Sequence, residues 1–136
     1  MASQDIHATA TPALAFLQRV SIFRGVSTDG LARIASITGE KVYSKKSIIF
    51  HEGDQGDTLY ILKQGRIKIS KITEDGREKT LCILQPGDFF GEMAIFDNMP
   101  RSATAEVIDD GAVVFTVSKR DFERLPYEPL YEDILG

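Results

Sequence analysis

The sequence predicts a mainly β fold with short flanking helices, namely a double-stranded β-helix, or jelly-roll. Two observations support this prediction. From Glu40 onward, apolar side chains often recur at every second position, as in residues 66–70, which is the period of a β-strand. Turn-forming pairs such as Gln64-Gly65 and Pro86-Gly87 divide the same region into runs of strand length. Many short strands with closely spaced turns are typical of a jelly-roll or barrel.

Short helices are expected on both sides of the strands. Apolar residues three or four positions apart predict one helix over residues 12–20. Ser27 is a good N-cap for a second helix, which Gly39 should end. Residues 119–125 are charged with two apolar positions, and predict a third short helix that stops before Pro126.

The clearest hairpin signal is the segment 74–77. Its Asp75-Gly76 pair can adopt the positive φ angles of a tight turn. Strand-length runs lie on both sides of it, at 68–73 and 78–84. These two runs are therefore predicted to pair as antiparallel strands.

The length of 136 residues and the hydrophobic content of 43% are enough for one core, and so predict one domain. We place this domain at residues 12–125. Residues 1–11 are mostly polar or small and are expected to be a flexible leader. Residues 126–136 form a tail with a possible short C-terminal helix, in which two prolines prevent a long regular helix before about Leu130.

Charge and cysteine content restrict the partners and the compartment. The formal net charge of −4 gives no general attraction to nucleic acid or anionic lipid, so we expect no direct nucleic-acid contact. No apolar run approaches the ~20 residues that cross a bilayer, so no membrane insertion is expected. The single cysteine, Cys82, excludes an intrachain disulfide and favours the cytoplasm. Its apolar neighbours predict a thiol buried in packing rather than a nucleophile.

The segment 86–107 carries the residues of a predicted anion site. Gly91 allows a tight turn, and a one-turn helix can begin directly after it. The free amides of Met93 and Ala94 could then donate to a phosphate. Arg101 supplies the counter-charge, and its planar fork can hold two phosphate oxygens. Strand alternation places Arg101 on the same face as Ala103, so the guanidinium should enter a pocket with small walls.

Glu92 needs a different partner, because a carboxylate beside a phosphate adds like-charge repulsion. A ribose 2′-hydroxyl is a donor that this carboxylate could accept from. A glutamate and an arginine on the two sides of one helix start therefore fit a sugar joined to a phosphate. The plainer alternatives are that Glu92 only complements the helix start and that Arg101 forms a surface ion pair.

Two blocks of sequence resemble the cyclic nucleotide-binding domain family, which includes bacterial catabolite-activator-like regulators and the regulatory domains of cyclic-nucleotide-dependent kinases and channels. The first block is the phosphate-binding cassette, with Phe90-Gly91-Glu92 followed by residues 100–104, Pro-Arg-Ser-Ala-Thr. The second is the upstream run of residues 49–65, which is similar to the β-roll signature of the family. The resemblance covers roughly residues 16–122.

The resemblance implies a role for each matched position. Glu92 would take the ribose hydroxyl and Arg101 the cyclic phosphate. Assisting or lining positions would be Gly91, Met93, Ala94, Ser102, Ala103, Ile69, Leu81 and Leu84. Members that prefer cGMP often carry threonine where this chain has Ser102, so cAMP is favoured over cGMP as the ligand.

The resemblance implies an allosteric sensor or regulatory module that acts on a protein effector or a fused output domain, and not an enzyme. A metal-dependent enzyme of similar fold needs clustered ligands, whereas His51 is the one histidine within the roll. Two alternatives stay open: an interaction domain of this fold that binds no nucleotide, and a fragment of a transcription regulator without its DNA-binding module. Many members cover the base with a long helix after the roll, where this chain has two prolines. Tyr127 and Tyr131 could form a substitute lid or pack on the roll.

Overall fold

Eight β-strands form two antiparallel sheets within residues 13–96 and 98–125, the parts of the chain that this computed structural model describes. One sheet has the order β1-β8-β3-β6, and the other has the order β2-β7-β4-β5. The strands are β1 (Gly39–Tyr43), β2 (Ile48–Phe50), β3 (Thr58–Gln64), β4 (Ile67–Ile72), β5 (Glu78–Leu84), β6 (Phe89–Phe90), β7 (Thr104–Val107) and β8 (Ala112–Ser118). This arrangement confirms the predicted mainly β jelly-roll.

Short helices flank the strands. The described chain begins in a helix at residues 13–17, followed by η1 (Ser21–Phe23) and α2 (Thr28–Ser36). The Ser27 hydroxyl accepts a hydrogen bond from the Gly30 amide at 3.0 Å, which confirms the predicted N-cap. Gly39 does not end this helix but opens β1. Two further helices are α3 (Met93–Phe96) and α4 (Lys119–Glu123), which corresponds to the helix predicted at 119–125.

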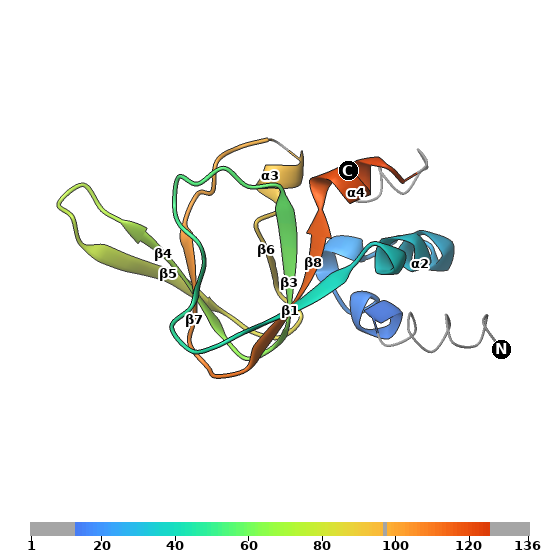
Figure 1. The fold of residues 1–136 in the computed structure, drawn as a ribbon, viewed down its shortest axis with the longest axis horizontal. Helices are drawn as coiled ribbons and strands as arrows, with labels where there is room; N and C mark the ends of the chain where they lie inside the picture. Colours follow the sequence, from blue (N-terminus) through green and yellow to red (C-terminus); the bar gives the residue numbers. More distant parts are fainter. Residues whose placement is uncertain (1–12, 97, 126–136) are drawn as a thin grey trace.

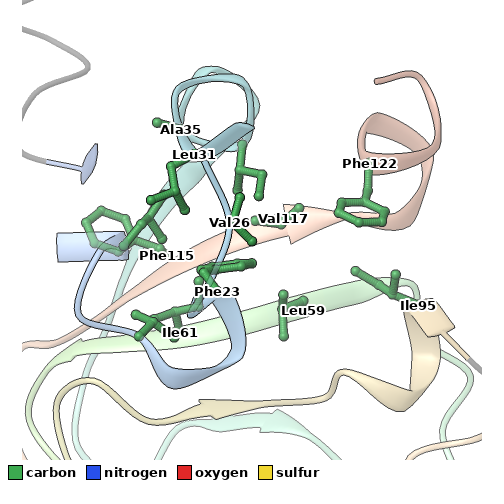
Figure 2. Close-up of a cluster of buried hydrophobic side chains, with 13 residues drawn as sticks. Phe23, Val26, Leu31, Ala35, Leu59, Ile61, Ile95, Phe115, Val117 and Phe122 are labelled. Carbon is green, nitrogen blue, oxygen red and sulfur yellow. The ribbon is translucent and has the colours of Figure 1, made fainter. Parts of the chain in front are cut away.

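Strands β3 and β8 are buried on both faces, so they separate two hydrophobic clusters. Leu59 and Phe115 face the helices, in a cluster that also holds Phe23, Leu31 and Phe122 (Figure 2). Alternate residues such as Leu62 and Val114 face the interior between the two sheets. The helices before the roll and α4 therefore cover one sheet, and the second cluster lies beside the space where a ligand could enter.

The β4–β5 hairpin has the predicted position and extends away from the rest of the roll (Figure 1). Its loop is closed by the Thr73 amide, which donates to the Arg77 carbonyl at 2.8 Å. Gly76 has a φ of +83°, whereas Asp75 is not among the residues with positive φ. The turn therefore needs one left-handed residue rather than the two of a type I′ turn.

The expectations for the leader 1–11 and the tail 126–136 lie outside the described residues, and so does the lid suggested for Tyr127 and Tyr131. Among the helices that the structure describes, none combines the length and the apolar character that a bilayer crossing needs.

Candidate functional site

Arg101 is held at the entrance to β7 by its own backbone. Its amide donates to the Asp54 carbonyl at 2.8 Å, and its carbonyl accepts from the Gly53 amide at 2.8 Å. Alternation then directs the side chains of Arg101, Ala103 and Ala105 inward, where all three are buried. The residue is only 6% exposed, so its guanidinium is enclosed by protein rather than by water.

Aromatic rings form the floor beneath this guanidinium. Its central carbon lies 4.2 Å from the centroid of the Phe50 ring and 5.7 Å from that of Tyr60. Tyr60 stacks in turn on Phe90, with 5.1 Å between the ring centroids. Cation–π attraction and contact with these rings therefore hold the guanidinium at a fixed position within the roll.

Two glycines approach the guanidinium so closely that no side chain fits between. A Cβ atom on Gly56 would lie 2.3 Å from Nε of Arg101, and one on Gly91 would lie 2.5 Å from a terminal nitrogen. Gly91 also has a φ of +78°, a backbone conformation that favours glycine. Its carbonyl accepts a hydrogen bond from Arg101 Nη1 at 3.0 Å. Gly56 and Gly91 thus leave the space that the arginine fills.

The charge of Arg101 is not neutralised at short range by the described residues. None of their carboxylates lies within ion-pair distance of it, and its Nε has no hydrogen-bond partner among them. Burial lowers the pKa of Arg101 below its ordinary value, although Tyr60, Asp57, Asp54 and Glu92 act to raise it. A buried cation without a paired charge is costly, so the site favours a bound anion.

Glu92 lies at the start of the one-turn helix α3, directly after β6 and Gly91. Its backbone carbonyl accepts from the Ile95 amide at 3.0 Å, which begins the helical turn. The residue is half-buried, and no described hydrogen bond uses its carboxylate. Ala94 belongs to the same helix, but its side chain lies outside what the structure describes. A half-buried carboxylate is therefore available near Arg101 for a ligand that donates a hydrogen bond.

A pocket of about 210 Å³ joins these residues. Most of the predicted site residues line it: Gly91, Glu92, Met93, Arg101, Ser102, Ala103, Ile69 and Leu84. Its remaining lining residues are Phe50, Cys82, Phe89, Phe90 and Pro100. The pocket therefore presents one positive charge, one carboxylate and an otherwise largely apolar wall.

The structure corrects two sequence expectations on β5. Leu81, expected in the pocket wall, is 48% exposed and is not among the lining residues. Cys82, expected to be buried in packing, is exposed and lines the pocket. Cys82 and Leu84 are two residues apart in β5, so strand alternation places both on the face that lines the pocket. Leu81 is the unpaired residue of a register shift, since Ile69 lies opposite Cys82 but Ser70 lies opposite Thr80.

Sequence reasoning also missed Phe50 as a site residue. Phe50 ends β2 and lies opposite Ala105 of β7, a pairing between segments far apart in the chain. Its apolar run predicts a strand, but no local pattern shows which residue will lie under Arg101. The one sequence signal is the small side chain of Ala105, which leaves room for a larger ring on the neighbouring strand.

Comparison with known proteins identifies the family to which this fold belongs. The family model described as the cyclic nucleotide-binding domain matches residues 40–126, which include Arg101, Glu92 and both glycines that contact the guanidinium. The chain belongs to the cyclic nucleotide-binding domain family. Two of the similar proteins are named as transcriptional regulators, and a third is named as a cGMP-dependent protein kinase.

A CRP-like cAMP-activated global transcriptional regulator of Mycobacterium tuberculosis is 38% identical over 94 residues, which make up 69% of this chain and 42% of that protein. The cGMP-dependent protein kinase egl-4 of Caenorhabditis briggsae is 31% identical over 111 residues, 81% of this chain and 15% of the kinase. The N-terminal domain of a transcriptional regulator from Streptomyces coelicolor has a similar structure, with a TM-score of 0.80 and 28% identity. That match covers 88% of this cyclic nucleotide-binding domain and 85% of the other chain. The chain thus spans less than half the length of either curated relative.

Proposed function

We propose that this cyclic nucleotide-binding domain binds a cyclic mononucleotide and acts as an allosteric sensor. One observation carries the proposal. Arg101 is only 6% exposed and forms no ion pair with a described carboxylate, so its positive charge faces the pocket without a partner. A cyclic phosphate is a small anion that can complete this charge balance, because the planar guanidinium can donate to two of its oxygens.

The other lining residues suit the remaining parts of such a ligand. The Glu92 carboxylate would accept from the ribose 2′-hydroxyl, which a deoxyribose lacks. Met93, Ala94, Ser102 and Ala103 would contact the phosphate, and Gly91 leaves room for the arginine. The apolar wall at Ile69 and Leu84 fits the flat face of a base.

We infer a preference for cAMP over cGMP. The support for this preference is Ser102, because family members that prefer cGMP often carry threonine at the matching position. The relatives are named for either nucleotide, so kinship alone does not separate the two. Calorimetric titration of the same protein with each ligand tests the preference, and tighter binding of cGMP contradicts it.

Helix α3 offers a route from ligand to output. Met93 lines the pocket, while Ile95, two residues later, lies in the hydrophobic cluster that also contains Phe122 of α4 (Figure 2). A ligand that moves α3 would therefore change the packing beneath α4. Such a shift acts as a signal when the two packing states bind the ligand with unequal affinity. The effector or output domain that reads this signal would act outside the described roll, and a reducing cytoplasm suits the free thiol.

Isothermal titration calorimetry with cAMP tests the proposal. Arg101→Ala should weaken binding by ~2 to 5 kcal/mol, roughly 30- to 4,000-fold, because a desolvated charge pair loses one partner. Arg66→Ala is a matched control, since this exposed arginine pairs with Asp109 at 3.0 Å outside the pocket lining. An affinity that is the same in wild type and Arg101→Ala removes Arg101 from the site. Wild-type protein that binds no cyclic nucleotide supports the interaction-domain alternative.

A further inference from the structure

Cys82 places a thiol in the wall of the pocket. It is the single cysteine of the chain, it is exposed, and it lines the same pocket as Arg101. Cys82 lies opposite Ile69 in the β4–β5 pair, and both residues line the pocket. The next residue, Ile83, lies outside that lining. A molecule that enters the pocket therefore meets a sulfur atom on its apolar side.

A second feature of this pocket selects the charge of such a molecule. Arg101 is 6% exposed, and its Nε has no hydrogen-bond partner among the described residues. A buried donor without a partner favours a ligand that supplies an acceptor, and a cation favours an anion. Glu92 lines the pocket as well and opposes this attraction, so the balance of the two charges sets the preference.

We propose that Cys82 is a thiol-modification site that takes a small anionic disulfide, and that the attached group prevents cyclic nucleotide from binding. The site would be a redox control of the sensor: the free thiol leaves the pocket open, and the mixed disulfide fills it. The second half of this inference rests on the proposed nucleotide site. The first half, the capture of an anionic disulfide, rests on Cys82 and Arg101 alone.

The chemistry is thiol–disulfide exchange. The Cys82 thiolate attacks one sulfur of the disulfide, the S–S bond of the reagent breaks, and a new bond forms between Cys82 Sγ and that sulfur. The other half of the reagent leaves as a thiolate and takes up the proton that Cys82 lost to solvent. The Cys82 sulfur is oxidised and the departing thiol is reduced, so the disulfide itself is the oxidant. A reducing thiol reverses the step by the same exchange.

The rate of labelling by 5,5′-dithiobis(2-nitrobenzoate), an anionic disulfide, measures the access to Cys82. The released chromophore reports one equivalent per chain, and Cys82→Ser should release none. Cyclic AMP at about 100 times its dissociation constant should slow the reaction about a hundredfold, because only the free fraction reacts. An unchanged rate, in protein that calorimetry shows to be saturated, overturns mutual exclusion. Labelled protein that binds cAMP as tightly as unlabelled protein overturns it as well.

The charge preference is measured against 2,2′-dithiodipyridine, a neutral disulfide. Arg101→Gln should slow the anionic reagent more than the neutral one, so the ratio of the two rates should fall severalfold. In wild-type protein, added salt should lower the same ratio, because screening weakens the attraction to Arg101; this arm does not depend on the folding of a variant. A ratio that neither change alters overturns anionic recognition. If wild-type protein binds no cyclic nucleotide, the proposed function fails, whereas these rate ratios still decide the modification site.

Discussion

The guanidinium carbon of Arg101 lies 4.2 Å from the centroid of the Phe50 ring. The ring supports the cation from below, while Gly56 and Gly91 approach it at its nitrogen atoms. Phe50 is therefore a positioning residue, which acts on a ligand through the arginine. Its ring keeps the charge at one depth in the pocket, so the site is organised before a ligand arrives.

Phe50→Leu should weaken cAMP binding by ~0.5 to 2 kcal/mol, because the cation–π contact is lost while an apolar side chain remains. Phe50→Tyr keeps the ring and should restore most of the affinity. Phe16→Leu is the matched control, since Phe16 contacts the Phe115 ring on the helical side of the sheet. Calorimetry measures the affinities, and equal affinity of Phe50→Leu and wild type would contradict the positioning role.

Gly56→Ala should displace the guanidinium, because the new Cβ would lie 2.3 Å from Arg101 Nε. We expect at least tenfold weaker cAMP binding, about 1.4 kcal/mol, with a smaller change in melting temperature. Gly76→Ala, in the β4–β5 loop, gives the opposite pattern: nothing lies within 4 Å of the added atom, but its φ of +83° costs ~1 kcal/mol of stability. Comparable affinity losses in the two variants would point to general destabilisation instead.

Glu92→Gln should reduce the discrimination between cAMP and 2′-deoxy-cAMP. In wild type the missing hydroxyl should cost ~1.5 to 3 kcal/mol, the range for a hydrogen bond to a charged group. The variant should bind cAMP more weakly than wild type, by less than Arg101→Ala does. Titration of both ligands against both proteins gives the coupling free energy between the Glu92 carboxylate and the 2′-hydroxyl. Equal binding of the ribose and deoxyribose ligands to wild type refutes the hydroxyl role.

Tyr60→Phe should change how stability depends on alkaline pH. Burial raises the pKa of the Tyr60 phenol above 10.0, with Tyr43 adding to the rise and Arg101 opposing it. Between the ordinary pKa and the raised pKa, the phenol has lost its proton in the unfolded state but keeps it in the folded state. The free energy of unfolding therefore falls as the pH rises through this range. Urea unfolding at about pH 8 and about pH 10.5 should show a smaller loss for Tyr60→Phe. Identical losses would contradict this origin.

The sequence was sufficient for the features that depend on local patterns. Two-residue periodicity and turn pairs predicted the two-sheet roll, and Ser27 predicted the helix start that the structure shows. The inward direction of Arg101 follows from its alternation with Ala103 and Ala105. These features need only the neighbours of each residue in the chain.

The errors have two origins. Cys82 and Leu84 are two residues apart in β5, so alternation within that strand alone predicts Cys82 in the pocket and Leu81 outside it, and the sequence did contain this signal. The contact of Phe50 with Arg101 depends on the pairing of β2 with β7, two strands far apart in the chain. Such contacts are set by the sheet as a whole, so a pattern within one segment does not contain them.

The helices before β1 have a practical consequence for work with this domain. They cover Leu59, Ile61, Phe115 and Val117, all of which are buried. A protein shortened to begin at Glu40, where the family match starts, would turn that apolar sheet face to water and should aggregate. Truncation for crystallisation or biosensor design therefore has to retain residues 13–39, although none of them lines the pocket.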